Sequence, residues 1–355
     1  MNKKKIIHIV ESWGSGVFSF LVDLVNKTNN DYEIIILHGR REETFEDYKE
    51  YFPKNVKLIE IANFTRSINP VKDIKAFFEI RKLLKKECPD IVHLHSSKAG
   101  FLGRFAVNTK KTKVLYNPHG FAYLAKDISK LKSSIYWLAE KIAAMRNCTI
   151  IGCSHGEYEE ALKLTKNSTC INNGVDTDKL SDITKNFQEK EIDFDNLKIA
   201  TIGRIGSQKN PVLFNEIAKK FLNYKFTWIG EGTDKTLLTS SNITITGWLN
   251  KERVLETLNK NDVFVLTSLW EGLPISLLEA MFLKKVCIVS NCIGNRDVIK
   301  NEYNGFICKN LQEFESILDT LKTKNLNQLK LNAIKDINEI FNLNKMIDGY
   351  KKIYE

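Results

Sequence analysis

Residues 262–293 read DVFVLTSLWEGLPISLLEAMFLKKVCIVSNCI and combine two apolar runs with a loop and a helical segment. The first run, DVFVLTS at 262–268, has the length and β-branched content of a buried strand. A turn at 270–274 precedes residues 275–285, which predict a helix with Pro just before its first turn and two Lys at its end. The run VCIVS at 286–290 predicts a second strand. This order is typical of an open parallel sheet, in which ligands bind at the carboxyl ends of the strands.

Two carboxylates mark the ligand-binding end of this predicted unit. Glu271 lies in the loop and Glu279 in the helix, with seven residues between them, so we expect both to face the same opening. The free backbone N–H groups of Ile275, Ser276 and Leu277 at the helix start would form an anion site. A ligand that carries hydroxyls and phosphates would suit this arrangement. The alternative is a surface Glu271 and a Glu279 that only favours the helix dipole.

Length and composition indicate two ordinary domains. The chain has 355 residues, of which 43% are hydrophobic, and this is enough for two cores. The sequence contains no run of about 18 apolar residues, so we expect no transmembrane helix. The opening MNKKKIIHIV lacks the features of a signal peptide. Seven Cys residues without a CxxC pair favour a reducing compartment. We therefore expect a cytoplasmic protein.

The net charge of +10 is concentrated in the first half of the chain. Residues 1–180 contain 29 Lys+Arg and 21 Asp+Glu, whereas residues 181–355 contain 24 and 22. Such an excess attracts nucleic acid, acidic lipid or diphosphate groups, but no nucleic-acid-binding motif accompanies it. Predicted helices at 70–87 and 130–146 surround an apolar stripe with Lys residues. Solvated helices and membrane-surface helices both have this pattern.

All six His residues lie in the first half, so a His-based general base would have to come from there. His93 and His95 lie two apart in a predicted strand, which puts both imidazoles on one side. His119 ends the next predicted strand. A metal at His93 and His95 would need a third ligand, and because none is near in sequence we expect no metal. The Asp-x-Asp sequence at 176–178 follows Asn-Gly-Val and predicts a helix cap and turn rather than a metal signature.

The second domain is predicted to begin at residue 197, where LKIATIGR opens a new strand. Residues 181–196 are polar and aperiodic, as expected of an interdomain linker. Arg204 closes the new strand, and Lys209 follows in a turn before a helix. Two such fixed cations would stabilise the negative charge of a departing diphosphate without a metal. The alternative is a pair of surface cations near a turn.

The sequence EGLPISLLE, from Glu271 to Glu279, resembles the Glu-x7-Glu motif of the retaining glycosyltransferases with the GT-B fold, in particular family 4. The flanking LTSLWEGLPISLLEAM is similar to the versions in bacterial polysaccharide-assembly enzymes, and the similarity extends over nearly the whole chain. The resemblance implies an α/β protein with two Rossmann-like domains that face each other across a cleft. It implies an acceptor-binding domain at 1–180, a nucleotide-sugar-binding domain at 197–340 and a C-terminal helix at 341–355 that crosses back to the first domain.

The resemblance also implies roles for individual residues. The expected catalytic residues are Glu271, His119, Arg204 and Lys209. The expected donor-binding residues are Gly16, Arg204, Lys209, Gly230, Trp248, Glu271, Gly272, Leu273, Pro274, Ile275, Ser276 and Glu279. The expected acceptor-binding residues are Ser15, His95 and His119. The chain departs from the family pattern at Ser15, where Gly is usual, and at Gly294 and Asp297, which stand for Gly-Gly-x-x-Glu.

The resemblance predicts a retaining, metal-independent transfer from a nucleotide diphosphate sugar, with UDP-hexose or UDP-N-acetylhexosamine expected, to a lipid-pyrophosphate-linked saccharide. The protein is expected to lie on the anionic inner face of the cell membrane and to need no cofactor and no nucleic acid. Front-face attack with the leaving phosphate as base is expected, because no side chain is clearly placed as a covalent nucleophile. One alternative is a nucleotide-sugar 2-epimerase of the same fold, which would act on the donor alone. The other is a non-enzymatic polyanion or nucleic-acid binder, against which the near-neutral second half argues.

Overall fold

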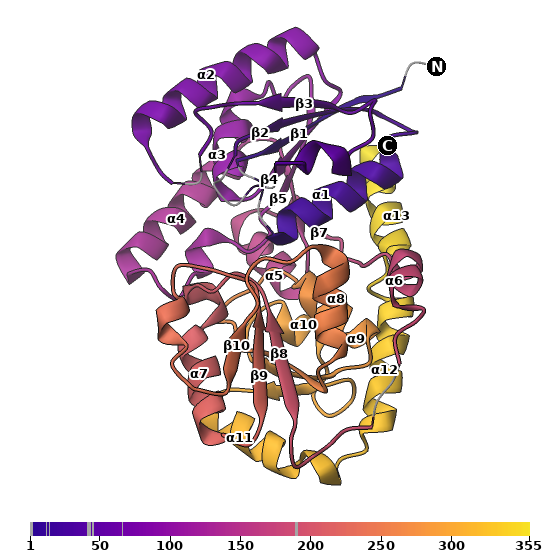
Figure 1. Cartoon of the computed structure of the whole chain (residues 1–355). Helices are drawn as coiled ribbons and strands as arrows, with labels where there is room; N and C mark the ends of the chain where they lie inside the picture. Colours follow the sequence, from indigo (N-terminus) through magenta and orange to yellow (C-terminus); the bar gives the residue numbers. More distant parts are fainter. Residues whose placement is uncertain are drawn as a thin grey trace. The chain divides into compact units, whose positions relative to one another are not determined.

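The computed structural model describes residues 3–11, 13, 15–40, 44, 46–65, 67–188 and 191–355. It divides into two compact units, of which the first comprises Met1–Asn172 with Met346–Glu355 and the second comprises Asn173–Lys345. Figure 1 labels most of the helices and many of the strands of both units. Among the described residues, none of the helices combines the length and hydrophobicity that a membrane crossing needs.

The division between the units falls before the expected boundary at residue 180. Residues 173–180 and the expected linker at 181–196 belong to the second unit. Helix α6 (Thr177–Thr184) occupies part of this stretch, and Asp176 caps it by accepting a hydrogen bond from the Lys179 backbone N–H at 3.0 Å. The Asp-x-Asp sequence is therefore a helix cap, as predicted.

In the described part of the first unit, seven parallel strands form one sheet in the order β3-β2-β1-β4-β5-β6-β7. The strands are β1 (Lys5–Val10), β2 (Glu33–His38), β3 (Lys57–Glu60), β4 (Ile91–His95), β5 (Lys113–Asn117), β6 (Thr149–Gly152) and β7 (Ser168–Cys170). The helices are α1 (Ser15–Thr28), α2 (Pro70–Glu87), α3 (Ser97–Ala106), α4 (Lys130–Ala143) and α5 (His155–Leu164). The strand order reverses between β1 and β4, so their carboxyl ends form the topological switch point where ligands bind in such sheets.

The elements of the first unit follow from local sequence. Strands β1 and β2 read KIIHIV and EIIILH and are buried almost throughout, as expected of parallel strands covered on both faces. Helix α2 begins at Pro70 because Asn69 accepts a hydrogen bond from the Lys72 N–H at 3.1 Å. It ends at Glu87, before Cys88 turns into the left-handed region at φ 45°. The predicted bounds of this helix are confirmed.

The described part of the second unit holds a six-stranded parallel sheet in the order β10-β9-β8-β11-β12-β13. The strands are β8 (Lys198–Ile202), β9 (Lys225–Ile229), β10 (Ile243–Ile245), β11 (Val263–Leu266), β12 (Val286–Ser290) and β13 (Phe306–Cys308). Besides α6, the helices are α7 (Pro211–Lys220), α8 (Lys251–Asn259), α9 (Ile275–Phe282), α10 (Asn295–Val298), α11 (Leu311–Thr320) and α12 (Leu326–Glu339). Here the strand order reverses between β8 and β11, so the loops that follow these two strands flank the switch point.

Helix α9 is shorter than predicted, because it ends at Phe282 rather than at Lys285. Lys284 adopts a left-handed conformation with φ 54°. Its N–H donates to the Met281 carbonyl at 3.0 Å, and the Lys285 N–H donates to the Ala280 carbonyl at 2.9 Å. These two bonds form a Schellman motif, which usually has Gly at the left-handed position. Because Lys stands there instead of Gly, this helix end could not be predicted from the residue types.

The C-terminal helix α13 (Leu343–Tyr354) carries the chain back into the first unit, as expected. Tyr350 and Tyr354 are fully buried. The Tyr354 hydroxyl lies 2.8 Å from His93 Nδ1 in β4, and the Lys4 ammonium donates to the Tyr354 carbonyl at 3.1 Å. The last residues of the chain are therefore part of the first unit's core.

Replacing Tyr354 with Ala should destabilise the protein by about 3–5 kcal/mol, because the change removes a fully buried ring. Thermal or denaturant unfolding of the whole chain measures the effect. Lys352→Ala, on the exposed side of the same helix, is the matched control and should stay within about 0.5 kcal/mol of the parent. Equal stabilities of the two variants would contradict the packing described for α13.

Candidate active site

Glu271 lies in the loop that follows β11 and is almost fully buried. Its Oε1 accepts hydrogen bonds from the Lys209 ammonium at 2.7 Å and from the Ser268 hydroxyl at 2.7 Å. Its Oε2 accepts a longer bond from Gln208 Nε2 at 3.4 Å. Both carboxylate oxygens are thus engaged, and the carboxylate is held in one orientation rather than free in solvent.

Lys209 comes from the 3-10 turn Ser207–Lys209 after β8. Thr267, at the end of β11, donates its hydroxyl to the Lys209 carbonyl at 2.7 Å and so ties the two loops together. Gly203 makes room for the lysine stem, since a Cβ at this residue would lie 2.7 Å from Lys209 Cε. A lysine ammonium has three N–H donors, so Lys209 can keep its bond to Glu271 and still bind an anion.

Arg204 directly follows Gly203 and is partly buried. Its Nε is the nearest atom, at 3.9 Å, to the place that a Cβ on Gly206 would occupy. The structure therefore puts the Arg204 guanidinium beside the same turn that carries Lys209. The two predicted cations lie in one loop after β8, at the switch point of the second sheet.

The start of α9 differs in one respect from the expected anion site. The Leu277 N–H donates to the Pro274 carbonyl at 3.1 Å. The prediction that this N–H is free is therefore wrong. The N–H groups of Ile275 and Ser276 remain at the first turn, where a helix supplies no acceptor of its own. Leu273, buried beside Gly272 and Pro274, has its carbonyl bound by Asn173 Nδ2 at 3.1 Å.

Glu279 is buried in α9 and forms an ion pair with Lys251 of α8. Sequence patterns predicted Lys251 only as the start of a helix. The ion pair was missed because it joins two helices that are separated by β11. The Lys251 side chain is exposed, so this ion pair connects the buried Glu279 carboxylate to the surface.

Two glycines allow close approaches around these loops. Gly230 has φ +143°, and a Cβ there would lie 2.2 Å from the Gly203 carbonyl oxygen. Gly294 has φ +84°, and its Cβ would lie 2.6 Å from the Gly272 carbonyl oxygen. Asp297 accepts a hydrogen bond from the Gly294 N–H at 2.8 Å, so the shorter acid fills a capping role at the start of α10. Trp248 is exposed and follows Gly247, which has φ +72°.

In the first unit, four imidazoles form a cluster: His8 and His93 lie within β1 and β4, His95 ends β4, and His119 follows β5. His8 Nδ1 lies 3.0 Å from His95 Nε2, and His95 Nδ1 lies 3.1 Å from His119 Nε2. His93 Nε2 lies 2.6 Å from Asn117 Oδ1. His8, His93 and His95 are fully buried, and His119 is partly buried.

These imidazoles are neutral at neutral pH. Burial lowers the pKa of His93 to about 4 and, together with the nearby His93, lowers the pKa of His119 to about 3. Burial and neighbouring imidazoles also hold the pKa values of His8 and His95 well below the ordinary value. At neutral pH, His119 therefore does not exist as a cationic acid.

His8 is the neighbour that sequence reasoning missed when it considered a metal at His93 and His95. Ring nitrogens of these three residues lie within 4.8 Å of one another, a spacing that could hold a metal ion. The pairing of strands brings these residues together, because β1 lies beside β4 in a register that aligns His8 with His93. However, both nitrogens of His93 already have hydrogen-bond partners, in Asn117 and Tyr354, so hydrogen bonds alone account for the position of this ring.

The backbone at His119 is held in an unusual conformation. His119 has φ 54° and Gly120 has φ 95°, which places a non-glycine residue in the left-handed region. The buried Glu157 accepts hydrogen bonds from the Gly120 N–H at 2.5 Å and the Cys153 N–H at 2.8 Å. Such a conformation persists only where its surroundings enforce it, and it is common at functional sites.

The remaining predicted residues lie at the start of α1. Ser15 is the first residue of this helix, but its side chain lies outside the described residues, as do Ser12 and Gly14 of the same loop. No atom of the described residues lies within 4 Å of the place that a Cβ on Gly16 would occupy. The roles expected for Ser15 and Gly16 stay predictions.

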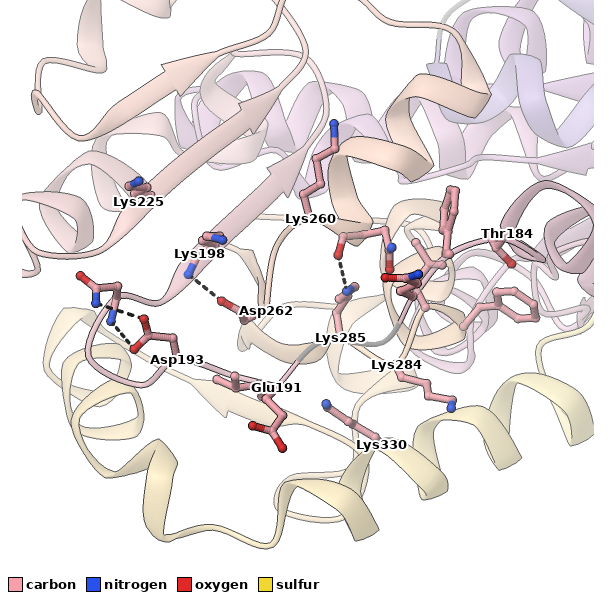
Figure 2. A pocket seen from close by; sticks show the side chains of 17 residues that line it. Thr184, Glu191, Asp193, Lys198, Lys225, Lys260, Asp262, Lys284, Lys285 and Lys330 are labelled. Carbon is pink, nitrogen blue, oxygen red and sulfur yellow. Dashed lines mark hydrogen bonds between the residues drawn. The ribbon is translucent and has the colours of Figure 1, made fainter.

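A separate pocket of about 490 Å³ lies at the opposite end of the second sheet, where strands begin (Figure 2). Lys198 opens β8 and Lys225 opens β9, and both line the pocket with Lys260 and Lys330. The Asp262 carboxylate accepts a hydrogen bond from the Lys198 N–H at 2.9 Å, as the dashed line in Figure 2 shows. Because ligands in open α/β sheets bind at the carboxyl ends of the strands, this pocket is not the candidate active site.

Comparison with known protein families gives two matches that divide the chain. The family model described as Glycosyltransferase Family 4 matches residues 14–179, and the model described as Glycosyl transferases group 1 matches residues 182–336. Together the matches span most of the chain.

Characterised relatives cover most of the chain as well. One is the UDP-Gal:alpha-D-GlcNAc-diphosphoundecaprenol alpha-1,3-galactosyltransferase of Escherichia coli, which is 32% identical over 340 residues, with 86% of this chain and 85% of the relative covered. Another is the N,N'-diacetylbacillosaminyl-diphospho-undecaprenol alpha-1,3-N-acetylgalactosaminyltransferase of Campylobacter jejuni, which is 25% identical, with 96% of each protein covered.

Solved structures share the two-domain fold at low sequence identity. Sucrose-phosphate synthase from Thermosynechococcus elongatus superposes with a TM-score of 0.79 at 14% identity, covering 99% of this chain and 98% of that chain. Anabaena HepE in complex with UDP-glucose superposes with a TM-score of 0.74 at 14% identity, covering 98% of each. With two family models across its length and a relative above 30% identity, this chain belongs to the group 1, family 4 glycosyltransferases of GT-B fold that act in polysaccharide assembly.

Proposed function

We propose that this protein transfers a hexose or N-acetylhexosamine from a UDP-sugar to a lipid-diphosphate-linked saccharide, with retention of configuration at the anomeric carbon. Support for the acceptor comes from the Escherichia coli and Campylobacter jejuni relatives, whose names specify diphosphoundecaprenol-linked sugars. Support for UDP comes from the first of these names and from the UDP-glucose complex of the HepE structure. Both relatives form alpha linkages, which retain configuration when the donor is also alpha-linked.

The observation that carries the proposal is the pairing of Lys209 with Glu271 at the switch point of the second sheet, beside Arg204 and the start of α9. Arg204, Lys209 and the N–H groups of Ile275 and Ser276 would hold the diphosphate. Negative charge grows on this group as the glycosidic bond breaks, and fixed donors that need no reorganisation stabilise it. Glu279 would accept hydrogen bonds from the ribose hydroxyls.

Glu271 would orient the donor sugar rather than attack it. Its carboxylate already accepts bonds from Lys209, Ser268 and Gln208, which reduces its nucleophilicity and fixes its direction. The acceptor hydroxyl would then attack from the face that the diphosphate leaves, with a diphosphate oxygen taking its proton. The cations of the chain itself would replace the divalent metal that other glycosyltransferases use.

We further propose that the first unit meets the membrane through α4. The residues Leu131, Ile135, Leu138 and Ile142 form an exposed apolar stripe, called here the α4 surface. Lys130 and Lys132 flank its first turn and are exposed. A basic helix with an exposed apolar face suits an anionic lipid surface, where a polyprenyl-linked acceptor would be found.

Glu271→Gln and Lys209→Met should each lower the transfer rate by about a hundredfold to a thousandfold, the cost of losing one preorganised charged group. The assay follows sugar transfer from a panel of UDP-sugars to a diphosphoundecaprenol-linked N-acetylglucosamine in the presence of EDTA. Lys225→Met, in the pocket at the opposite end of the sheet, is the matched control and should keep the parental rate.

Three outcomes of this assay would count against the proposal. Unchanged turnover in Glu271→Gln or Lys209→Met would remove the proposed site. Activity that disappears in EDTA and returns with Mg²⁺ would contradict metal independence. Conversion of the UDP-sugar to an epimer without any acceptor would favour the epimerase alternative instead.

Replacing both Lys130 and Lys132 with Ser should weaken binding to anionic vesicles about thirtyfold, because each basic residue near such a surface contributes about 1 kcal/mol. Vesicle co-sedimentation at low salt measures the binding. The control replaces Lys225 and Lys260 with Ser, which removes the same charge from the second unit and should leave vesicle binding unchanged. If the parent protein does not bind anionic vesicles even at low salt, the membrane proposal is wrong.

A further inference from the structure

The first unit contains a row of three imidazoles that ends at His119. His8 and His95 are joined at 3.0 Å through Nδ1 and Nε2, and His95 and His119 are joined at 3.1 Å through Nδ1 and Nε2. Each contact links one Nδ1 to one Nε2, so the row has a direction. In every link one ring nitrogen must donate its hydrogen and the other must accept, because a neutral imidazole has one of each.

Two arrangements of hydrogens satisfy both links. In the first, His8 Nδ1–H donates to His95, and His95 Nδ1–H donates to His119 Nε2. In the second, every hydrogen is on Nε2 and the bonds run from His119 towards His8. The two differ at the ends of the row, on His8 Nε2 and on His119 Nδ1.

The buried end of the row distinguishes these arrangements. His8 Nε2 is buried and has no hydrogen-bond partner among the described residues. The second arrangement would leave an N–H group there, and orphaned buried N–H groups are rarer in proteins than orphaned acceptors. The first arrangement leaves only a lone pair, so it is the favoured one.

The neighbouring His93 does not disturb this assignment. Asn117 Nδ2 donates to the Ile151 carbonyl at 3.0 Å, which turns Asn117 Oδ1 towards His93 Nε2. His93 Nε2–H must therefore donate, and His93 Nδ1 accepts from the Tyr354 hydroxyl. Both nitrogens of His93 are used, and neither is available to His8.

We propose that His8 and His95 are positioning residues that fix the tautomer of His119, so that His119 carries its hydrogen on Nδ1 and offers an N–H donor to an oxygen of a ligand bound at this edge of the first unit's sheet. The strained backbone at His119 and its anchor at Glu157 keep the ring at the end of the row. His119 then stabilises an oxygen and does not remove a proton. The identity of the oxygen rests on the proposed sugar transfer, but the tautomer does not.

The tautomer is measured directly in protein labelled with ¹⁵N-histidine, by long-range proton–nitrogen correlation of the imidazole rings without any substrate. The His119 signals are identified by their loss in His119→Asn. We expect a protonated Nδ1 and an unprotonated Nε2 on His119 at neutral pH. A protonated Nε2, or a doubly protonated ring, would overturn the proposal.

Variants of His8 test whether His8 determines the tautomer of His119. His8→Asn keeps an amide N–H near the position of Nδ1 and should preserve the His119 tautomer, whereas His8→Leu removes the donor and should give signals of both tautomers. An unchanged His119 spectrum in folded His8→Leu would remove His8 from the proposal. If His8→Leu does not fold, the spectrum of the unmodified protein still decides the tautomer.

Variants of His119 test the role of the donor. Asn places an amide near the position of Nδ1, and Gln reaches the position of Nε2. The transfer rate should fall by about a hundredfold in His119→Gln, as for the loss of one donor, and by clearly less in His119→Asn. Equal losses would overturn the donor role. A protein that shows the predicted tautomer but transfers no sugar would instead refute the proposed function and leave the assignment of His119 intact.

Discussion

The ion pair between Lys209 and Glu271 is the contact on which the second unit's site depends. The two residues are 62 positions apart, and they meet only because β8 and β11 are neighbours in the sheet. Removing two charges from water costs several kcal/mol, and a single ion pair seldom recovers this cost. The Ser268 and Gln208 bonds to the same carboxylate offset part of it. A site that must bind an anionic ligand gives a physical reason to keep a charged pair where an apolar pair would be more stable.

Sequence patterns predicted the parts of this site that depend on local rules. The local signals for a strand end and a helix start identified three of these parts. They are the Glu-x7-Glu spacing, the Pro before α9 and the cations after β8. The contacts between these parts were beyond local rules. Lys251 reaches Glu279 from a helix that precedes β11, and Leu277 turns its N–H to Pro274. Both depend on side-chain and backbone placement that no periodicity encodes, as does the Schellman end of α9 at Lys284.

The histidine cluster shows the same limit more clearly. His93 and His95 could be placed on one face of a strand from their spacing alone. That His8 is their neighbour could not be predicted. The order of strands in a parallel sheet is set by the crossover connections and not by the spacing of residues within one strand. The register of β1 against β4 then aligns His8 with His93. Glu157, which holds Gly120 in place, was missed for the same reason.

Buried polar rings in the central strands of a parallel sheet are costly, because each nitrogen needs a partner that apolar neighbours cannot supply. A sheet that needed only stability would place Val or Ile at His8, His93 and His95, as it does at most other positions of β1 and β4. Here each link in the row from His8 through His95 to His119 pairs one donor with one acceptor, and the row transfers a hydrogen-bonding direction from the core to His119. With no protonated imidazole available at neutral pH, this direction is the property that the cluster can pass on to a ligand.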